Sequence, residues 1–260
     1  MINTRKSLAT VAIALSAGLG FTACSNGGNN AGPESSQSQQ AQQGLSDEAK
    51  GQVEGFLDGY YQHVSGFKAP EVPKDISDIL NKVKEPGDSK DVNKLADAIN
   101  SSLNDEDKKK VIDYLKQNDP TYNDFDREGL SDGQNIVLSV VNMGMGSSLA
   151  GAKQMGAGDA QLKADQSKLE FGDNTATLKK DALSLESKDG SSASAQPSDQ
   201  ASDKSGQPSG DEINKQIGDR LGEMLDGVQA KRVDDSWKID GKQFLEHFNK
   251  MAASSSPSAK

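Results

Sequence analysis

The sequence predicts an α+β fold, with a helical N-terminal half packed against a small antiparallel sheet in the C-terminal half. Apolar residues recur at helical spacing through most of residues 45–118, whereas after residue 160 they alternate around tight-turn sequences. Helices that precede a run of strands are typical of α+β domains.

Four amphipathic helices are expected before residue 120, each with a start or stop signal of its own. Ser46 precedes two acidic residues, and Asn104 stands before another acidic run, so both are predicted N-caps. Prolines and glycines separate the helices. The apolar stripes of these helices fall within residues 53–64, 76–83, 92–99 and 111–115. The most apolar run, Ile136–Leu149, favours a buried helix over a strand, and its glycine-rich end leaves the strand as the alternative.

Two hairpins are expected in the second half. Gly172-Asp173-Asn174 separates one pair of alternating segments, and Asp234-Asp235 separates another. Between them, an apolar stripe that follows Asp211 predicts a helix. Asp240 and Gln243 have the spacing of a capping box for a last helix.

Three stretches contain no large apolar residue or almost none, and we expect them to be disordered because they cannot bury enough surface to offset the entropy of ordering. They predict a tether at 24–44, an insertion at 188–210 and a Ser-rich tail at 252–260. A single α+β domain over 45–251 remains.

The N-terminal segment predicts export. Arg5 and Lys6 precede an apolar or small stretch over 8–20, which is shorter than the roughly 20 residues that a membrane-spanning helix needs. Phe21-Thr22-Ala23-Cys24 follows, and Cys24 is the only cysteine. This block resembles the lipobox of bacterial lipoproteins, although the first position of the lipobox is usually Leu.

The lipobox resemblance implies a signal peptide over 1–23, cleaved between Ala23 and Cys24, and a diacylglycerol and acyl chains on the Cys24 thiol. Two or more long acyl chains make membrane attachment stable. The implied location is the extracytoplasmic face of the cell membrane, with the membrane itself as a partner. A plainly secreted protein with a free Cys24 is the alternative.

The charge of the chain disfavours nucleic acid as a partner. The formal net charge is −10, and removal of Arg5 and Lys6 with the signal would make it −12. An acidic domain is repelled by phosphate and by anionic headgroups.

Segments of the C-terminal half resemble those of small extracytoplasmic NTF2-like and cystatin-like domains. The resemblance rests on three segments: Leu169–Asp173, Ala176–Leu178 and Val233–Ile239. It implies an N-terminal helix against a curved antiparallel sheet, with a ligand cavity that Tyr60, Tyr61, Met143 and Trp237 would line. Ordinary core packing is the alternative for each of these four residues.

Residues 124–135 carry two motifs with a chemical interpretation. Gly129-Leu130-Ser131-Asp132-Gly133 matches G-x-S-x-G, but no buried strand precedes it, so we interpret Ser131 as a helix cap. Carboxylates at Asp124, Asp126, Glu128 and Asp132 have a spacing like that of a calcium loop, although Asn135 stands where a bidentate Glu is expected. A solvated acidic turn is the alternative to a calcium site.

The two histidines, His63 and His247, are isolated and lack metal-ligand spacing. We therefore expect no enzyme, no catalytic residues and no cofactor beyond the acyl chains and the calcium alternative. The predicted function is a non-catalytic ligand-binding or adaptor module of the cell envelope, whose partner is an envelope protein or a small hydrophobic ligand. A carrier of lipid or glycolipid is the alternative, and a hydrolase ranks third.

Overall fold

A computed structural model describes residues 45–84, 91–154, 158–188 and 209–254. The predicted signal peptide, Ala23, Cys24 and the tether over 24–44 lie outside the described residues. So do most of the predicted insertion and the last part of the predicted tail.

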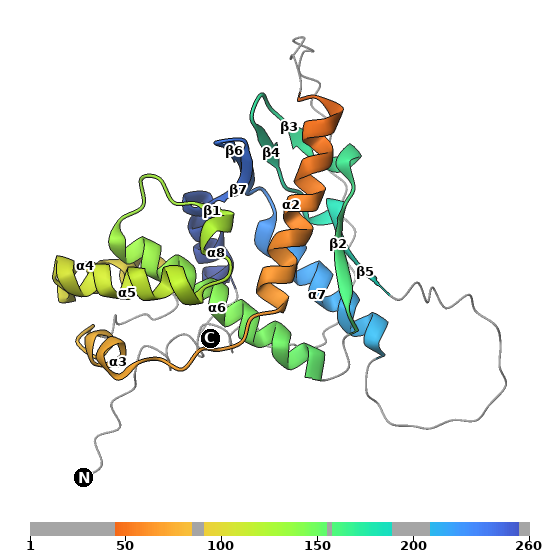
Figure 1. The fold of residues 1–260 in the computed structure, drawn as a ribbon. Helices are drawn as coiled ribbons and strands as arrows, with labels where there is room; N and C mark the ends of the chain where they lie inside the picture. Colours follow the sequence, from red (N-terminus) through yellow and green to blue (C-terminus); the bar gives the residue numbers. More distant parts are fainter. Residues whose placement is uncertain (1–44, 85–90, 155–157, 189–208, 255–260) are drawn as a thin grey trace, which may run out of the picture.

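Seven α-helices lie within the described residues, and the α+β prediction is confirmed (Figure 1). They are α2 (Asp47–Ser65), α3 (Lys74–Leu80), α4 (Val92–Ser102), α5 (Asp105–Asn118), α6 (Asp132–Gln154), α7 (Gly210–Leu225) and α8 (Gly241–Ser254). The predicted caps of the first helices are confirmed, since the Ser46 side chain accepts a hydrogen bond from the Ala49 amide and Asn104 accepts one from Asp107. The apolar run Ile136–Leu149 lies within the buried helix α6, as predicted.

The strands form one five-stranded sheet and one separate two-stranded ribbon. In the larger sheet the order is β1-β7-β6-β4-β3, and in the ribbon β2 pairs with β5. The strands are β1 (Phe125–Asp126), β2 (Ala160–Ala164), β3 (Glu170–Phe171), β4 (Thr175–Thr177), β5 (Leu183–Ser187), β6 (Gln229–Val233) and β7 (Ser236–Asp240). The described residues also form three short 3-10 helices: η1 (Tyr122–Asp124), which precedes β1, η2 (Gln166–Lys168), between β2 and β3, and η3 (Lys180–Ala182), between β4 and β5.

The prediction of one antiparallel sheet was wrong in two respects. First, β1 pairs with β7 in parallel, with Phe125 opposite Ile239, so the larger sheet is mixed. Second, the segments around residues 162 and 185 form the ribbon and do not extend the first hairpin. β1 is only two residues long, and its partner β7 lies far along the chain. β3 and β4 lie between β2 and β5 in the sequence, so neither the β1–β7 nor the β2–β5 pairing has a local signal.

Both predicted hairpins are present. β3 and β4 pair around residues 172–174, and β6 and β7 pair around Asp234 and Asp235. The two aspartates have φ values of 48° and 61°. Two successive residues with positive φ make the type I′ turn that matches the twist of paired strands, and aspartate tolerates this conformation.

The β2–β5 ribbon lies between α2 and α7 (Figure 1). Side chains of α2 bond the outer edge of β2: the Leu162 amide donates to Asp58 Oδ1 at 2.9 Å, and Gln62 Nε2 donates to the Ala160 carbonyl at 3.0 Å. On the other side, Gly218 of α7 brings its backbone close to Leu185 of β5. Both edges of the ribbon are therefore covered, which prevents pairing with a foreign strand.

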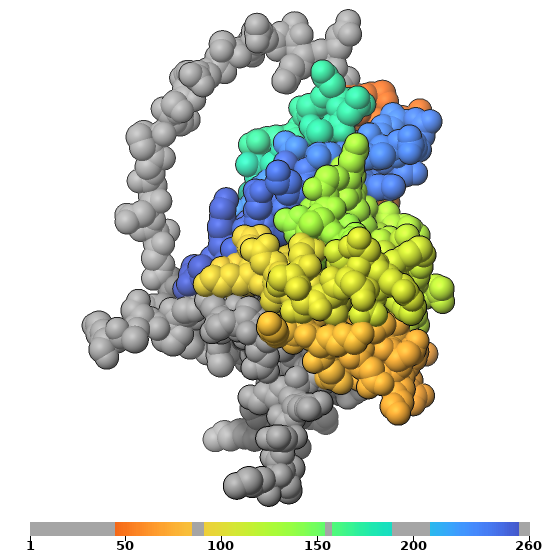
Figure 2. All heavy atoms as spheres, turned by 90° about the vertical axis from the view of Figure 1, so that its left-hand side faces the viewer, coloured from red at the N-terminus to blue at the C-terminus, as the bar shows by residue number. Residues whose placement is uncertain are grey.

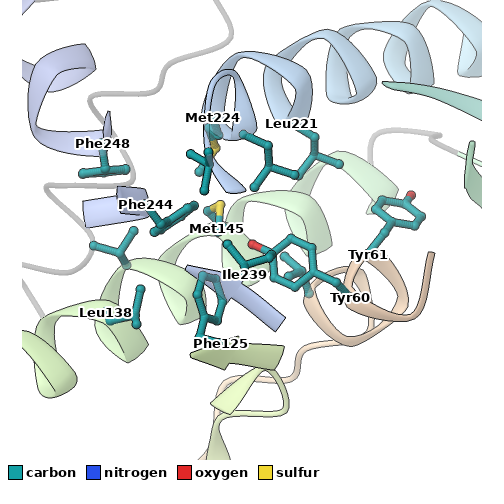
Figure 3. Close-up of a cluster of buried hydrophobic side chains, with 14 of the residues drawn as sticks. Tyr60, Tyr61, Phe125, Leu138, Met145, Leu221, Met224, Ile239, Phe244 and Phe248 are labelled. Carbon is teal, nitrogen blue, oxygen red and sulfur yellow. The ribbon is translucent and has the colours of Figure 1, made fainter. Parts of the chain in front are cut away.

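The hydrophobic core joins α2, β1, α6, α7, β7 and α8 (Figure 3). Phe125 lies at its centre, edge-on to Tyr60 at 5.7 Å between ring centroids and to Phe244 at 5.2 Å. Phe125 is buried because β1 directs it inward, so the short parallel strand connects the sheet to two helices.

Two boundary predictions need correction. α8 continues through Ser254, because Met251 packs against the core and Ser254 Oγ donates to the Met251 carbonyl, so the predicted tail begins within a helix. Ser209 is the N-cap of α7, with a capping box to Glu212, so the predicted insertion ends earlier than residue 210.

The predicted capping box at Asp240 is half formed: the Gln243 amide donates to Asp240, but the Gln243 side chain bonds Gln229.

Candidate functional site

A polar cluster lies where the end of α2 meets η1, β1 and the first turns of α6. Arg127 is its centre. The guanidinium lies 3.8 Å from the centroid of the Tyr122 ring and donates to the Tyr122 carbonyl, the Asn135 carbonyl and Ser139 Oγ, each at 3.0 Å. Burial lowers the pKa of Arg127, against the opposing effect of Tyr122 and Asp119.

Asp119 provides the negative charge nearest to Arg127. Its Oδ2 lies 3.6 Å from Arg127 Nη2, and its Oδ1 accepts hydrogen bonds from the Thr121 amide and hydroxyl. The Asp119 side chain is 1% exposed. Because the guanidinium is bonded on several sides to this chain, Arg127 fastens η1 to α6 and offers little to an external ligand.

The outer part of the cluster is an imidazole–carboxylate pair. His63, in the last turn of α2, places Nδ1 2.7 Å from Asp124 Oδ2 of η1; the His63 side chain is 50% exposed and that of Asp124 is 12% exposed. Burial raises the pKa of Asp124, while the hydrogen bond from His63 opposes that rise. Such a pair can hold or move a proton, and nucleophilic catalysis would need a hydroxyl or thiol beside it.

Ser131 does not supply that hydroxyl. Its Oγ accepts hydrogen bonds from Asn100 Nδ2 and from the Gln134 amide, and the Ser131 amide donates to the Gln134 side chain. This geometry is that of a helix N-cap, which confirms the interpretation of Ser131 as the cap of α6.

Three of the four carboxylates of the predicted calcium loop, Asp124, Asp126 and Asp132, have different partners. Asp124 bonds His63, and Asp126 accepts from the Glu128 amide and lies 3.6 Å from Lys231. Asp132 begins α6 and lies 3.9 Å from Lys108. Within the part of the chain that the structure describes, no group of three or more His, Cys, Asp or Glu side chains could hold a metal ion. The extended strand β1 replaces the tight loop that a calcium site requires.

The four residues predicted to line a ligand cavity belong to the packed interior or its margin. Tyr60 and Tyr61 are 1% and 2% exposed, and Trp237 is 5% exposed. Met143 is partly buried on α6. Tyr60 donates its hydroxyl hydrogen to Asn142 Oδ1 at 3.1 Å, so its polar atom is used inside the protein.

A small apolar cleft lies elsewhere, between α6 and α7. Figure 3 shows Met145, Leu221 and Met224 converging beside it. Its volume is about 50 Å³, whereas pockets for drug-sized ligands have roughly 300–1,000 Å³. The lining residues are Met145, Ser148, Leu149, Ile217, Arg220, Leu221 and Met224. Met145 and Leu149 belong to the apolar run Ile136–Leu149.

Sequence reasoning missed Arg127 and the pairing of His63 with Asp124. The signal available for Arg127 was a single cation within an acidic segment directly before the most apolar helix. Nothing local links His63 to Asp124, because the two residues are 61 positions apart.

Comparison of the chain with protein-family models, with curated proteins and with solved structures found no match. Among the described helices none is long and apolar enough to cross a membrane. The resemblance to NTF2-like and cystatin-like domains stays a prediction.

Proposed function

We propose that this chain is a lipid-anchored protein of the extracytoplasmic face of the cell membrane that acts as a non-catalytic binding or adaptor module. The observation that carries the proposal is the position of Cys24, directly behind a charged start, a short apolar stretch and two small residues. The 20 residues between Cys24 and Leu45 are polar or small, a composition that suits a linker between an anchor and a domain.

The surface of the described domain supports recognition through exposed groups. Nearly all large apolar side chains of the described residues are buried or partly buried, and the cleft between α6 and α7 is small. The His63–Asp124 pair is the most accessible part of the polar cluster, and its bonds hold α2 to η1. These features suit a rigid body that presents a surface to a partner.

Intact mass and membrane fractionation of the wild type beside Cys24→Ser test the anchor. We expect the wild type in the membrane fraction with the mass of residues 24–260 plus acyl chains, and the variant in the soluble fraction. Both proteins in the medium with unmodified masses would remove the anchor and the location from the proposal.

A lipid or glycolipid carrier is the second candidate, and the apolar lining of the α6–α7 cleft favours it. Native mass spectrometry of the protein purified from its host separates the two functions. Co-purified lipid that is lost in Leu221→Gln would support the carrier, and a bare protein mass supports the adaptor.

A further inference from the structure

The segment that joins α2 to α3 combines two prolines with solvent exposure. Its sequence is Lys68-Ala69-Pro70-Glu71-Val72-Pro73, which contains the spacing P-x-x-P. Pro70 is partly exposed, and its neighbours from Lys68 to Pro73 are exposed. Val72 is 40% exposed, and no other large apolar side chain of the described residues is counted as exposed.

The backbone of this segment is held extended by local chemistry. Each proline fixes its own φ at about −65°, and the residue before a proline is confined to the β or polyproline II region. Ala69 and Val72 are such residues. Pro73 has φ −57° and ψ 148°, which is close to the polyproline II conformation.

The backbone is also open to a partner. Within the described residues, the amides of Lys68, Ala69, Glu71 and Val72 donate no hydrogen bond to another group of the chain. Both ends of the segment are fixed. At one end Phe67 is buried against Gly146 of α6. At the other end the Ser77 amide donates a hydrogen bond to the Pro73 carbonyl, and Ile76 of α3 is buried. The segment is therefore an arch with fixed ends.

A polyproline II segment with fixed ends loses little entropy on binding, and such segments dock in grooves lined by aromatic side chains. We propose that residues 68–73 are the docking segment of this protein, and that the partner is an envelope protein with an aromatic-lined groove that receives Pro70, Val72 and Pro73. This inference rests on the proposed adaptor function and names the surface that performs it.

The position of the arch fits a partner away from the membrane. The tether would enter at Leu45, before α2, whereas the arch follows the other end of that helix (Figure 1). The 19 residues of α2 put the two points about 28 Å apart along the axis at a rise of about 1.5 Å per residue. In Figure 2 the lighter orange spheres of α3, the helix that follows the arch, lie at the surface of the domain.

The test places the photo-cross-linking residue p-benzoylphenylalanine at position 72 of the full chain in its host. The matched control carries it at position 52, where Gln52 is exposed on α2. We expect a cross-linked protein from position 72 alone, with the cross-link in a peptide that contains Trp or Tyr. A lipid adduct, or equal adducts from both positions, would overturn the proposal.

The purified cross-linked partner is then titrated by calorimetry with the wild-type chain and with Pro70→Ala/Pro73→Ala. We expect about tenfold weaker binding by the double variant, because each proline restricts the free segment. Val72→Asp, at an exposed position, should weaken binding without lowering the melting temperature, so loss of binding is separated from misfolding. Affinities of both variants within about twofold of the wild type would overturn the proposal.

Fractionation of the same strains distinguishes this inference from the proposed function. An anchored protein without an adduct specific to position 72 would overturn the docking segment and leave the anchor intact. A protein released into the medium would overturn the proposed location whatever cross-links it forms.

Discussion

α2 and α6 both contain several glycines, and the two helices differ in how closely other elements approach those glycines. In α6, a Cβ at Gly133 would collide with the Ala96 carbonyl of α4, and one at Gly146 would lie 2.5 Å from Phe67 Cβ. In α2, a Cβ at Gly51, Gly55 or Gly59 would meet nothing within 4 Å. Gly133 and Gly146 of α6 therefore allow close packing, whereas Gly151 of α6 and the three glycines of α2 have open space around them and weaken their helices without a packing gain.

The two helices are also fastened to their neighbours differently. Neighbouring elements approach the backbone of α6 directly. α2 instead reaches out with side chains: Asp58 and Gln62 bond β2, Tyr60 bonds Asn142 of α6, and His63 bonds Asp124. The same residue type therefore stabilises one helix contact and destabilises a helix elsewhere, and the surroundings decide which.

Gly133→Ala gives the largest effect expected from this comparison. Overpacking against the Ala96 backbone should destabilise the protein by about 1–3 kcal/mol, although alanine favours the helix intrinsically by about 1 kcal/mol. Urea unfolding followed by circular dichroism measures the change. An unchanged or raised stability would show that α4 and α6 can separate freely at this point.

Tyr60→Phe tests the attachment of α2 to α6 through side chains. It leaves the buried Asn142 Oδ1 without its donor, so we expect a loss of about 1–2 kcal/mol in the free energy of unfolding. Tyr114→Phe is the matched control, because the buried Tyr114 hydroxyl has no hydrogen-bond partner in the structure. Equal losses in both variants would mean that the Tyr60 hydroxyl contributes no specific bond.

Gly55→Ala should have the opposite sign to Gly133→Ala. The position is exposed and open, so alanine should stabilise the protein by about 0.5–1 kcal/mol through helix propensity and a less flexible unfolded chain. The same urea titration measures it. A loss of stability would indicate that the glycine face of α2 contacts something beyond the described residues.

Local signals predicted the helices well. Ser46, Asn104 and Ser131 were recognised as caps because a cap bonds amides two or three residues away, and periodicity placed α2, α4 and α5. The continuous apolar run placed α6. The tight turn at Asp234 and Asp235 was found for the same reason. In contrast, the two-residue strand β1 and the separation of the β2–β5 ribbon depend on partners that lie far along the chain.

The polar cluster was harder to predict than the fold. The spacing of Asp124, Asp126 and Asp132 was typical of a calcium loop, but His63, Lys231 and Lys108 lie near these carboxylates from three other elements. No local pattern predicts these three side chains as neighbours of the carboxylates. The glycines of α6 obscured the type of that segment for a related reason, since the elements that pack on them are remote in sequence.

The His63–Asp124 pair gives the smallest effect, which is a slope of stability against pH. Burial raises the pKa of Asp124 above its ordinary value of 3.8 in the folded protein. Between the two pKa values the folded state binds more protons than the unfolded state, so this carboxyl makes stability fall as pH rises through that window. In Asp124→Asn this contribution should be absent, so the stability of the wild type relative to the variant should decline with rising pH.

His63→Ala should steepen the decline, because the hydrogen bond from His63 holds the Asp124 pKa down. Urea titrations in a pH series measure both differences, and a relative stability that rises with pH would show that the pair with His63 outweighs burial.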